Sequence, residues 1–197
     1  MTLTAVLFVG GKSRRMGADK ATLVLNGEPL WSRQLGVLRE LKPEKILISA
    51  RKKPAWCPPE IDVVLDEPPS RGPLSGLAAA LKKMQTTHLL VLAVDLPRMN
   101  AVHLRKLWKL ARANCGVLPS IEGELEPLCA IYPGGEITAA AAEKALSGRD
   151  YSLQRFAAAL VNQKRLMILP LAHAEKDCYL NVNTPEELAA AHQTGTA

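Results

Sequence analysis

The chain has 197 residues, of which 48% are apolar and 22% are charged, and its net charge is +6. This length and composition predict one globular domain with a sizeable core and leave little room for a second full domain. Runs of about 18 apolar residues are missing, and the short apolar run near residue 1 follows no basic leader, so we expect a cytoplasmic protein without a membrane partner.

The surplus of positive charge lies in the first 60 residues. They contain 11 Lys or Arg against 5 Asp or Glu, a surplus of 6, so the other 137 residues sum to zero. A local surplus favours an anionic partner bound at that part of the chain. Nucleic acid fits poorly, because no Trp or Phe interleaves with the cations of residues 12–20 to stack on bases. We therefore expect a small phosphorylated ligand.

The predicted elements alternate between strands and helices. The first strands occupy residues 3–9, 45–49, 62–65 and 88–93, and helical periodicity covers residues 30–41, 74–84 and 102–113. Strands at 115–118, 128–132 and 166–169 and helices at 137–146 and 153–160 follow, and the proline-rich segments 54–59 and 68–73 are predicted loops. A capping box at Thr184-Pro185-Glu186-Glu187 begins a last helix. This alternation predicts an α/β fold whose parallel-core sheet is covered on both faces.

A glycine pair and a group of cations directly follow the first strand. Glycines allow a sharp turn and a close approach of backbone N–H groups to a ligand, and ligands bind at the carboxyl ends of parallel strands. The spacing matches neither the Rossmann fingerprint nor a P-loop. The loop indicates phosphate binding, with a solvated basic turn as the alternative. Its candidate residues are Gly10, Gly11, Lys12, Ser13, Arg14, Arg15, Gly17 and Lys20.

Two carboxylates end predicted strands. Asp95 follows the strand at 88–93, where it can bind Mg²⁺ together with substrate phosphates, although an Asp before Leu-Pro could equally cap a turn. Asp66 follows the strand at 62–65, where its side chain could cap a loop. The four cysteines have no CxxC spacing, and we expect them to be free thiols.

Two further segments carry small polar or flexible residues. Gly72 and Gly76 flank a predicted helix start, whose N–H groups can bind a base or ribose, unless the glycines only end a loop and permit close packing. Asn181 and Asn183 alternate in an extended segment, so their side chains point to one face. They can bind a polar substrate or the outer shell of a metal, unless Asn183 only helps to start the last helix.

Together these motifs resemble the MobA family, the molybdenum cofactor guanylyltransferases of the nucleotidyltransferase superfamily. The first motif is typical of the whole superfamily, whereas the glycine-proline loop and the closing NxNTPxxL pattern narrow the resemblance to this family. The matches follow the family order from residue 3 to about 191. They are GGKSRRMGADKA at 10–21, Asp66, GPLSG at 72–76, VDLP at 94–97, EPL at 126–128 and NVNTP at 181–185.

The resemblance implies a three-layer, Rossmann-like fold of the GT-A type with a mostly parallel mixed sheet. About residues 1–100 of its single domain would bind the nucleotide and about 101–193 the acceptor. The implied reaction transfers GMP from GTP to the terminal phosphate of molybdopterin or molybdenum cofactor and releases pyrophosphate. Other cofactor-biosynthesis proteins and recipient molybdoenzymes are further expected partners.

The resemblance also implies residue roles. Lys20 and Arg15 would neutralise the triphosphate as catalytic residues, and Asp95 would hold the cofactor Mg²⁺. The implied nucleotide-binding residues are Gly10, Gly11, Lys12, Ser13, Arg14, Gly17, Lys20, Asp66, Gly72, Pro73 and Gly76, and the implied acceptor-binding residues are Asn181, Asn183 and Glu126.

Some positions depart from the family pattern, and they leave alternatives open. Glu126 stands where glutamine is frequent, and Ser49-Ala50-Arg51 lacks an asparagine often found there, so the exact substrate is the open question. A related enzyme could use CTP with molybdopterin, or a nucleotide with a sugar 1-phosphate. A protein of another class, a non-catalytic nucleotide-binding or nucleic-acid-binding module, would bind without turnover.

Overall fold

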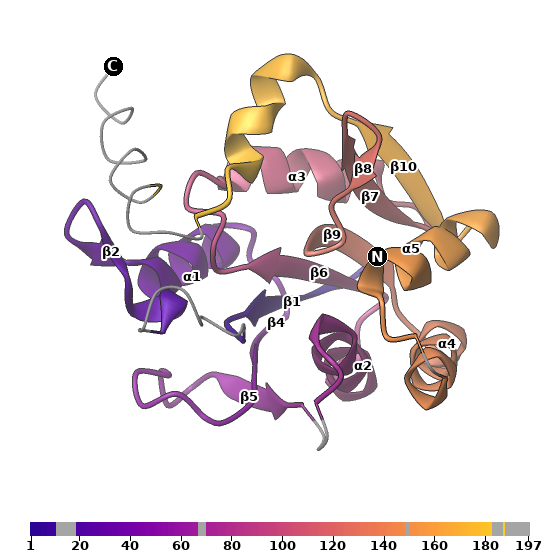
Figure 1. Cartoon of the computed structure of the whole chain (residues 1–197), viewed down its shortest axis with the longest axis horizontal. Helices are drawn as coiled ribbons and strands as arrows, with labels where there is room; N and C mark the ends of the chain where they lie inside the picture. Colours follow the sequence, from indigo (N-terminus) through magenta and orange to yellow (C-terminus); the bar gives the residue numbers. More distant parts are fainter. Residues whose placement is uncertain (11–18, 67–69, 149, 183–186, 188–197) are drawn as a thin grey trace.

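A mixed sheet forms the middle layer of the molecule (Figure 1). The computed structural model describes residues 1–10, 19–66, 70–148, 150–182 and 187. Eight strands of this part of the chain form the sheet in the order β10-β7-β9-β6-β1-β4-β5, with β8 paired to β7. The strands are β1 (Leu3–Phe8), β4 (Lys45–Ala50), β5 (Asp62–Leu65), β6 (His88–Ala93), β7 (Gly116–Ile121), β8 (Glu124–Leu125), β9 (Cys129–Pro133) and β10 (Leu166–Pro170).

The sheet is mixed because β9, inside the sheet, and the short β8 run against the other strands. Strands β1, β4, β5 and β6 pair in parallel, as do β7 and β10, whereas β9 runs antiparallel to both β6 and β7. The antiparallel strand follows a tight β7–β8 hairpin whose turn residues Glu122 and Gly123 have φ of 52° and 91°. Because β9 runs the other way, its first residues lie at the edge where β1 and β6 end.

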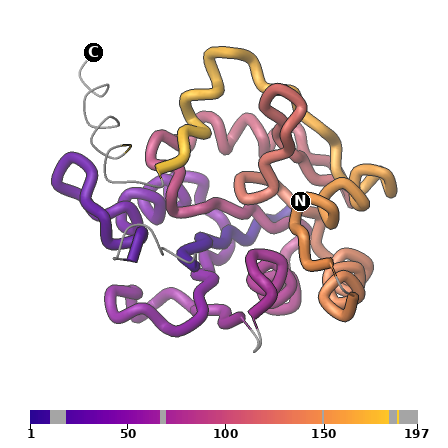
Figure 2. The backbone as a smooth tube through the Cα atoms, viewed as in Figure 1, coloured from indigo at the N-terminus to yellow at the C-terminus, as the bar shows by residue number. Residues whose placement is uncertain are grey.

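Helical segments cover both faces of the sheet (Figure 1). One face carries α1 (Leu30–Glu40), α3 (Ala101–Leu110) and the 3-10 segment η2 (His173–Tyr179), and the other carries α2 (Pro73–Lys83), α4 (Glu136–Ser147) and α5 (Leu153–Asn162). Figure 2 shows α2 and α4 side by side although they are far apart in sequence. Strand β1 is buried throughout: Ala5 and Leu7 face one core, and Val6 and Phe8 face the other. The predicted three-layer fold is confirmed.

Several predicted elements needed correction. Helix α3 ends at Leu110, because Ala111 is extended and Arg112 forms a bridge with Cys115. The prediction that Pro73 lies in a loop was wrong: it is the first residue of α2, where proline loses no helical hydrogen bond. The short elements η1 (Lys20–Thr22), β2 (Val24–Leu25), β3 (Glu28–Pro29), β8 and η2 were not predicted from the sequence.

Other predictions concern the ends of the chain and the cysteines. The predicted last helix lies outside the described residues apart from Glu187. Across the described ranges, every helix is too short or too polar to cross a bilayer. All four cysteines are free, as predicted.

Candidate functional site

The carboxyl ends of the central parallel strands bring several predicted residues to one edge of the sheet. Gly10 follows β1, Asp66 follows β5, and Asp95 lies two residues after β6. Backbone hydrogen bonds continue the sheet beyond the strand ends and fix these positions. They run from Val9 N to Ser49 O (3.1 Å), from Val94 N to Phe8 O (3.0 Å) and from Asp66 N to Ala50 O (3.2 Å).

An ion pair lies at this edge. Lys20 Nζ is 3.0 Å from Asp95 Oδ2, and the two side chains are only 17% and 20% exposed. Lys20 is the first residue of η1, whose N-cap Asp19 accepts a hydrogen bond from the backbone N–H of Ala21. Partial burial strengthens the attraction between the charges, because water screens them less. The fold thus brings two oppositely charged residues that are 75 positions apart in sequence into one ion pair.

A first cavity of about 250 Å³ opens beside α2. Asp66 is its carboxylate, and the hydroxyl of Ser70 donates a 2.8 Å hydrogen bond to Asp66 Oδ2. Gly72 has a φ of 78° and precedes α2 without a side-chain cap, and its carbonyl accepts a 3.0 Å hydrogen bond from the N–H of Ser75 in the first helical turn. The cavity is lined by Phe8, Gly10, Ser49, Arg51, Asp66, Gly72 and Pro73.

Gly76 holds α2 close to this first cavity. A Cβ at this position would lie 2.2 Å from Ser49 Oγ, 2.9 Å from Phe8 Cε1 and 3.2 Å from Asp66 Oδ1. Any larger residue would push the helix away from β1 and β4 or displace the Asp66 carboxylate. The glycine therefore acts through packing, which was the alternative reading of this position.

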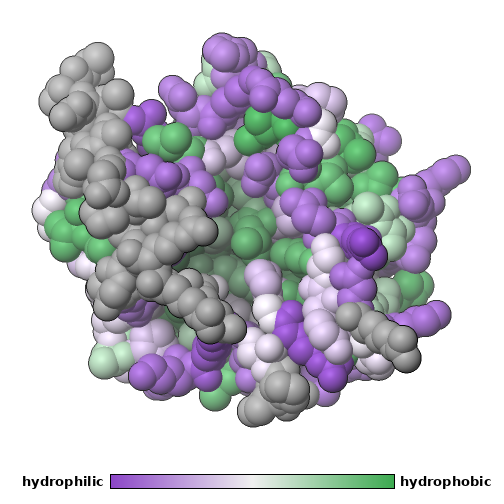
Figure 3. Space-filling model, viewed as in Figure 1, coloured by the Kyte–Doolittle hydropathy of each residue, from purple (hydrophilic) through white to green (hydrophobic). Residues whose placement is uncertain are grey.

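A second cavity of about 360 Å³ lies on the other side of Pro73, which lines both cavities. Its polar groups include Asp95, Glu126, Tyr151 and Asn181, and its apolar residues include Ala93, Leu96 and Leu128. Figure 3 shows a hollow near the centre of the molecular face, with an apolar floor and a largely polar rim. The second cavity thus combines carboxylates with apolar surface, as sites for small organic ligands do.

Glu126 is a half-buried carboxyl group of the second cavity. Burial raises its pKa above the ordinary value, and the negative charge of Glu124 raises it further. Within the described part of the chain it has no ion-pair partner. Its carboxylate is therefore free to accept hydrogen bonds from a ligand with N–H groups.

A buried polar network supports both walls of the second cavity. The hydroxyl of Tyr179 lies 2.9 Å from His103 Nε2 and also forms a hydrogen bond with the thiol of Cys129, the first residue of β9. On the other side of the ring, His103 Nδ1 lies 3.4 Å from Glu175 Oε1. Burial lowers the pKa of His103, so the neutral ring can donate from Nδ1 to Glu175 and accept the Tyr179 proton at Nε2. Tyr179 therefore links the segment before Asn181 to the strand after Glu126.

Two backbone contacts hold the Asp95 turn in place. The N–H of Val182, a fully buried residue, donates a 3.0 Å hydrogen bond to the carbonyl of Asp95 and brings Asn181 to the second cavity. From the other side, Arg33 Nε donates a 2.7 Å hydrogen bond to the carbonyl of Pro97. The turn is thus fixed by α1 and by the segment that follows η2.

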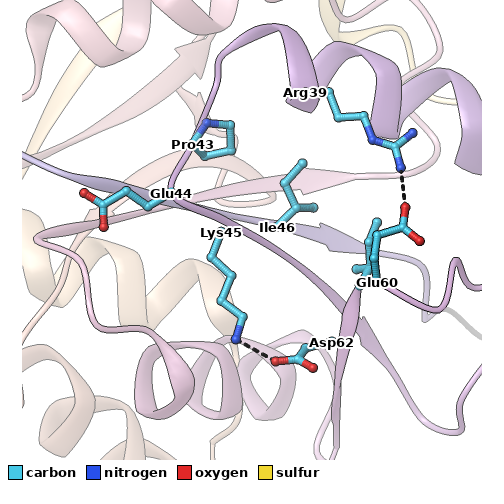
Figure 4. A pocket seen from close by; sticks show the side chains of 8 residues that line it. Arg39, Pro43, Glu44, Lys45, Ile46, Glu60 and Asp62 are labelled. Atoms are coloured by element: carbon cyan, nitrogen blue, oxygen red, sulfur yellow. Dashed lines mark hydrogen bonds and ion pairs between the residues drawn. The ribbon is translucent and has the colours of Figure 1, made fainter.

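A third cavity of about 320 Å³ lies at the amino ends of β4 and β5, on the opposite edge of the sheet (Figure 4). Four of its charged side chains form two facing pairs, Lys45 with Asp62 at 2.6 Å and Arg39 with Glu60 at 3.0 Å, whereas Glu44 points away from them. All four side chains are 45% to 61% exposed. This cavity contains none of the predicted site residues.

The structure places part of the predicted site and leaves the rest undescribed. Gly10, Lys20, Asp66, Gly72, Pro73, Gly76, Asp95, Glu126 and Asn181 lie in or beside the first and second cavities. Gly11, Lys12, Ser13, Arg14, Arg15, Gly17 and Asn183 lie outside the described residues. Tyr151, in a loop, and Tyr179, the last residue of η2, were missed, because no sequence motif marks a single tyrosine at such a position.

The comparison with known families decides what kind of domain this is. The model of the MobA-like NTP transferase domain matches residues 5–165. The chain belongs to the MobA-like NTP transferase family. The family predicted from the motifs is therefore confirmed.

Similar proteins and solved structures support this family assignment and the fold. A probable molybdenum cofactor guanylyltransferase of Opitutus terrae is 38% identical over 188 residues, which cover 94% of this chain and 92% of that protein. The crystal structure of molybdopterin-guanine dinucleotide biosynthesis protein A from Archaeoglobus fulgidus has a TM-score of 0.72 at 23% identity, covering 96% of this chain and 97% of that one. The structure of a nucleotidyl transferase from Methanothermobacter has a TM-score of 0.74 at 13% identity, and the match covers 98% of this chain and 96% of that one. At these identities the two structures show a shared fold.

Proposed function

We propose that this protein is a molybdenum cofactor guanylyltransferase, which transfers GMP from GTP to the terminal phosphate of molybdopterin or molybdenum cofactor. The observation that carries the proposal is the half-buried Lys20–Asp95 pair at the edge where the first and second cavities lie. Two of its relatives are named as a probable molybdenum cofactor guanylyltransferase and a molybdenum cofactor guanylyltransferase, and the match covers 92% and 91% of their chains. A cytoplasmic location belongs to the proposal, because GTP is a cytoplasmic metabolite.

The chemistry of the first cavity supports guanine as the base. Guanine carries two adjacent donors, its ring N1–H and its 2-amino group, and the carboxylate of Asp66 has two oxygens that only accept. Cytosine presents a donor next to an acceptor on the corresponding edge, so one of its groups would face a carboxylate oxygen without a proton between them. An unpaired buried polar group is costly, and this favours GTP over CTP.

The reaction needs no general base. The acceptor phosphate is already ionised near pH 7, so one of its oxygens can attack the α-phosphorus of GTP directly. A new P–O bond forms there while the bond to the bridging oxygen breaks, and pyrophosphate leaves with that electron pair. Charge compensation and positioning lower the barrier in such transfers. In this chain Lys20 would neutralise the triphosphate, and Gly72 and Pro73 at the start of α2 would line the place of the nucleoside.

The residues around Asp95 fit a magnesium ion that is completed by substrate. In the described part of the chain no three His, Cys, Asp or Glu side chains come together as a metal cage. Asp95 and the amide of Asn181 supply oxygen donors, and Mg²⁺ is commonly held by one or two carboxylates together with substrate phosphates. The ammonium of Lys20 lies beside Asp95 and balances its negative charge. When bound, the ion would stabilise charge on the phosphates.

Pyrophosphate release tests the proposed function. The protein is incubated with Mg²⁺, one of GTP, CTP or ATP, and either molybdopterin or a sugar 1-phosphate. We expect release only with GTP and molybdopterin, and we expect none when Mg²⁺ is chelated. Release with CTP or with the sugar phosphates would reassign the substrates, and nucleotide binding without any release would reject the enzyme assignment.

A further inference from the structure

A cation and an aromatic ring meet at the margin of the second cavity. The guanidinium carbon of Arg71 lies 4.5 Å from the centre of the Tyr151 ring. Arg71 directly precedes Gly72 and Pro73 at the start of α2, and Tyr151 lies in the loop between α4 and α5. The pair thus bridges two elements that flank the place where the first and second cavities adjoin.

The two members of the pair relate differently to the second cavity. Tyr151 lines it and is half-buried, whereas Arg71 does not line it. The guanidinium lies over the ring of Tyr151, and Tyr151 itself contributes to the lining of the cavity. A guanidinium on an aromatic ring is attracted to the electrons of the ring face, and this contact limits how the ring can turn. The lining of the cavity thus includes an aromatic residue whose ring is held by a neighbouring cation.

Among the groups that line the second cavity in the part of the chain that the structure describes, Tyr151 is the one that can stack on a flat ring of a ligand. Its carboxylates, Asp95 and Glu126, can accept hydrogen bonds, and no Lys or Arg is among the described residues that line it. Arg71, in the loop before α2, is a cation next to the cavity. Within the described part of the chain it forms no ion pair with a carboxylate. A flat, nitrogen-rich heterocycle can stack on a tyrosine and donate to a carboxylate, whereas a sugar offers no aromatic face.

We infer that Tyr151 is the specificity-determining residue for the acceptor: it stacks on the flat ring of the acceptor, Arg71 positions the tyrosine, and acceptors without such a ring are disfavoured. This inference rests on the proposed function, since it concerns the acceptor side of the same site. Residues that bind the acceptor phosphate cannot distinguish one acceptor from another, because the phosphate group is the same in all of them. Tyr151 and Arg71 would provide this distinction by selecting acceptors with a flat ring. Arg71 acts through Tyr151 and is a positioning residue.

Steady-state kinetics with three variants test the inference. Tyr151→Leu removes the ring, Tyr151→Phe keeps it, and Arg71→Lys keeps the charge without the flat guanidinium. We expect Tyr151→Leu to raise the KM for molybdopterin about tenfold, as expected for the loss of one stacking contact, with kcat and the KM for GTP changed less than about twofold. Tyr151→Phe is expected to rescue most of the loss, and Arg71→Lys to raise the KM about threefold. Arg105→Ala is the control, because Arg105 is exposed and contacts Glu40 on the α1–α3 face.

The outcomes separate the inference from the proposed function. If the wild-type protein transfers no GMP to molybdopterin, the proposed function fails. If it does, and Tyr151→Leu has the acceptor KM of the wild type, the inference is overturned. An equal loss in kcat and in both KM values, with a lowered unfolding temperature, would also overturn it, because the pair would then serve only the fold. Quenching of the fluorescence of a 6-substituted pterin by wild type and Tyr151→Phe, but not by Tyr151→Leu, would support it without any turnover.

Discussion

The second and third cavities are of similar volume, and each has a lysine paired with an aspartate at its side. At the carboxyl edge Lys20 and Asp95 are 17% and 20% exposed, whereas at the amino edge Lys45 and Asp62 are 45% and 50% exposed. The amino-edge charges neutralise one another in water, and such pairs contribute little to stability. The carboxyl-edge pair lies where strand ends and a helix start bring further polar groups together. The candidate site therefore differs from the third cavity in the burial of its charges and in the further polar groups that meet there, but not in its volume.

The largest expected difference between the two edges comes from the aspartates. Asp95→Asn removes the carboxylate charge at the candidate site, and we expect transfer activity to fall at least about a thousandfold. Asp62→Asn removes the same charge at the third cavity and is expected to leave activity within about twofold, because exposed pairs are weak. GMP transfer by both variants, with circular dichroism to check folding, gives the comparison. Equal activities would show that the carboxyl edge is not the site.

The lysines provide a second comparison. Lys20→Ala is expected to lower kcat about a hundredfold, because the charge developing on the triphosphate then loses a cation. Lys45→Ala is the matched control and loses an ion pair of similar length that is largely exposed. Single-turnover rates at saturating GTP separate this effect from weaker binding. A raised KM for GTP with an unchanged single-turnover rate would assign Lys20 to binding alone.

Helix glycines give a third and smaller difference, now in stability. Gly76→Ala places a methyl group against Ser49 and Phe8, and we expect it to cost about 1–3 kcal/mol of unfolding free energy and to weaken GTP binding. Gly36→Ala in α1 meets nothing within 4 Å and is expected to gain about 0.5–1 kcal/mol. Urea unfolding measures both changes. A neutral Gly76→Ala would show that α2 can move away from β1 without cost.

The smallest difference is a dependence of stability on pH. The pKa of Glu126 is raised in the folded state, so as the pH rises above the ordinary value of 4.5 the folded protein bears a cost that the unfolded chain does not. Glu126→Gln removes this cost. We expect the variant to be more stable than the wild type near about pH 7 and the gain to vanish near about pH 4. Glu60→Gln, at the third cavity, is the control, and thermal unfolding at both pH values is the measurement.

Much of the fold was predictable because its signals are local. Apolar runs predicted the buried strands, and helical periodicity with loop prolines predicted the helices on both faces. The β2–β3 hairpin was missed although its Asn26-Gly27 turn, with φ of 52° and 83°, is a known hairpin signal. The reversal of β9 was not predictable from the alternation of elements, because a short apolar run has the same pattern in either direction.

The candidate site was predictable only where motifs mark it. Lys20, Asp66 and Asp95 follow strands or glycines in recognisable patterns, and the structure brings them to one edge. The roles of Tyr151 and Tyr179 depend on contacts with residues far away in sequence, such as Arg71 and His103. Side chains of this kind have no local signal, because only the folded chain creates their surroundings.

The hydrogen bond from Val182 to the carbonyl of Asp95 has a consequence for how the protein matures in the cell. The Asp95 turn is synthesised about halfway along the chain, but its backbone partner leaves the ribosome 87 residues later. The strands β1, β4, β5 and β6 are therefore synthesised well before the segment that holds the Asp95 turn. We expect the Asp95 turn to reach its final position only after the segment that contains Asn181 and Val182 has been synthesised.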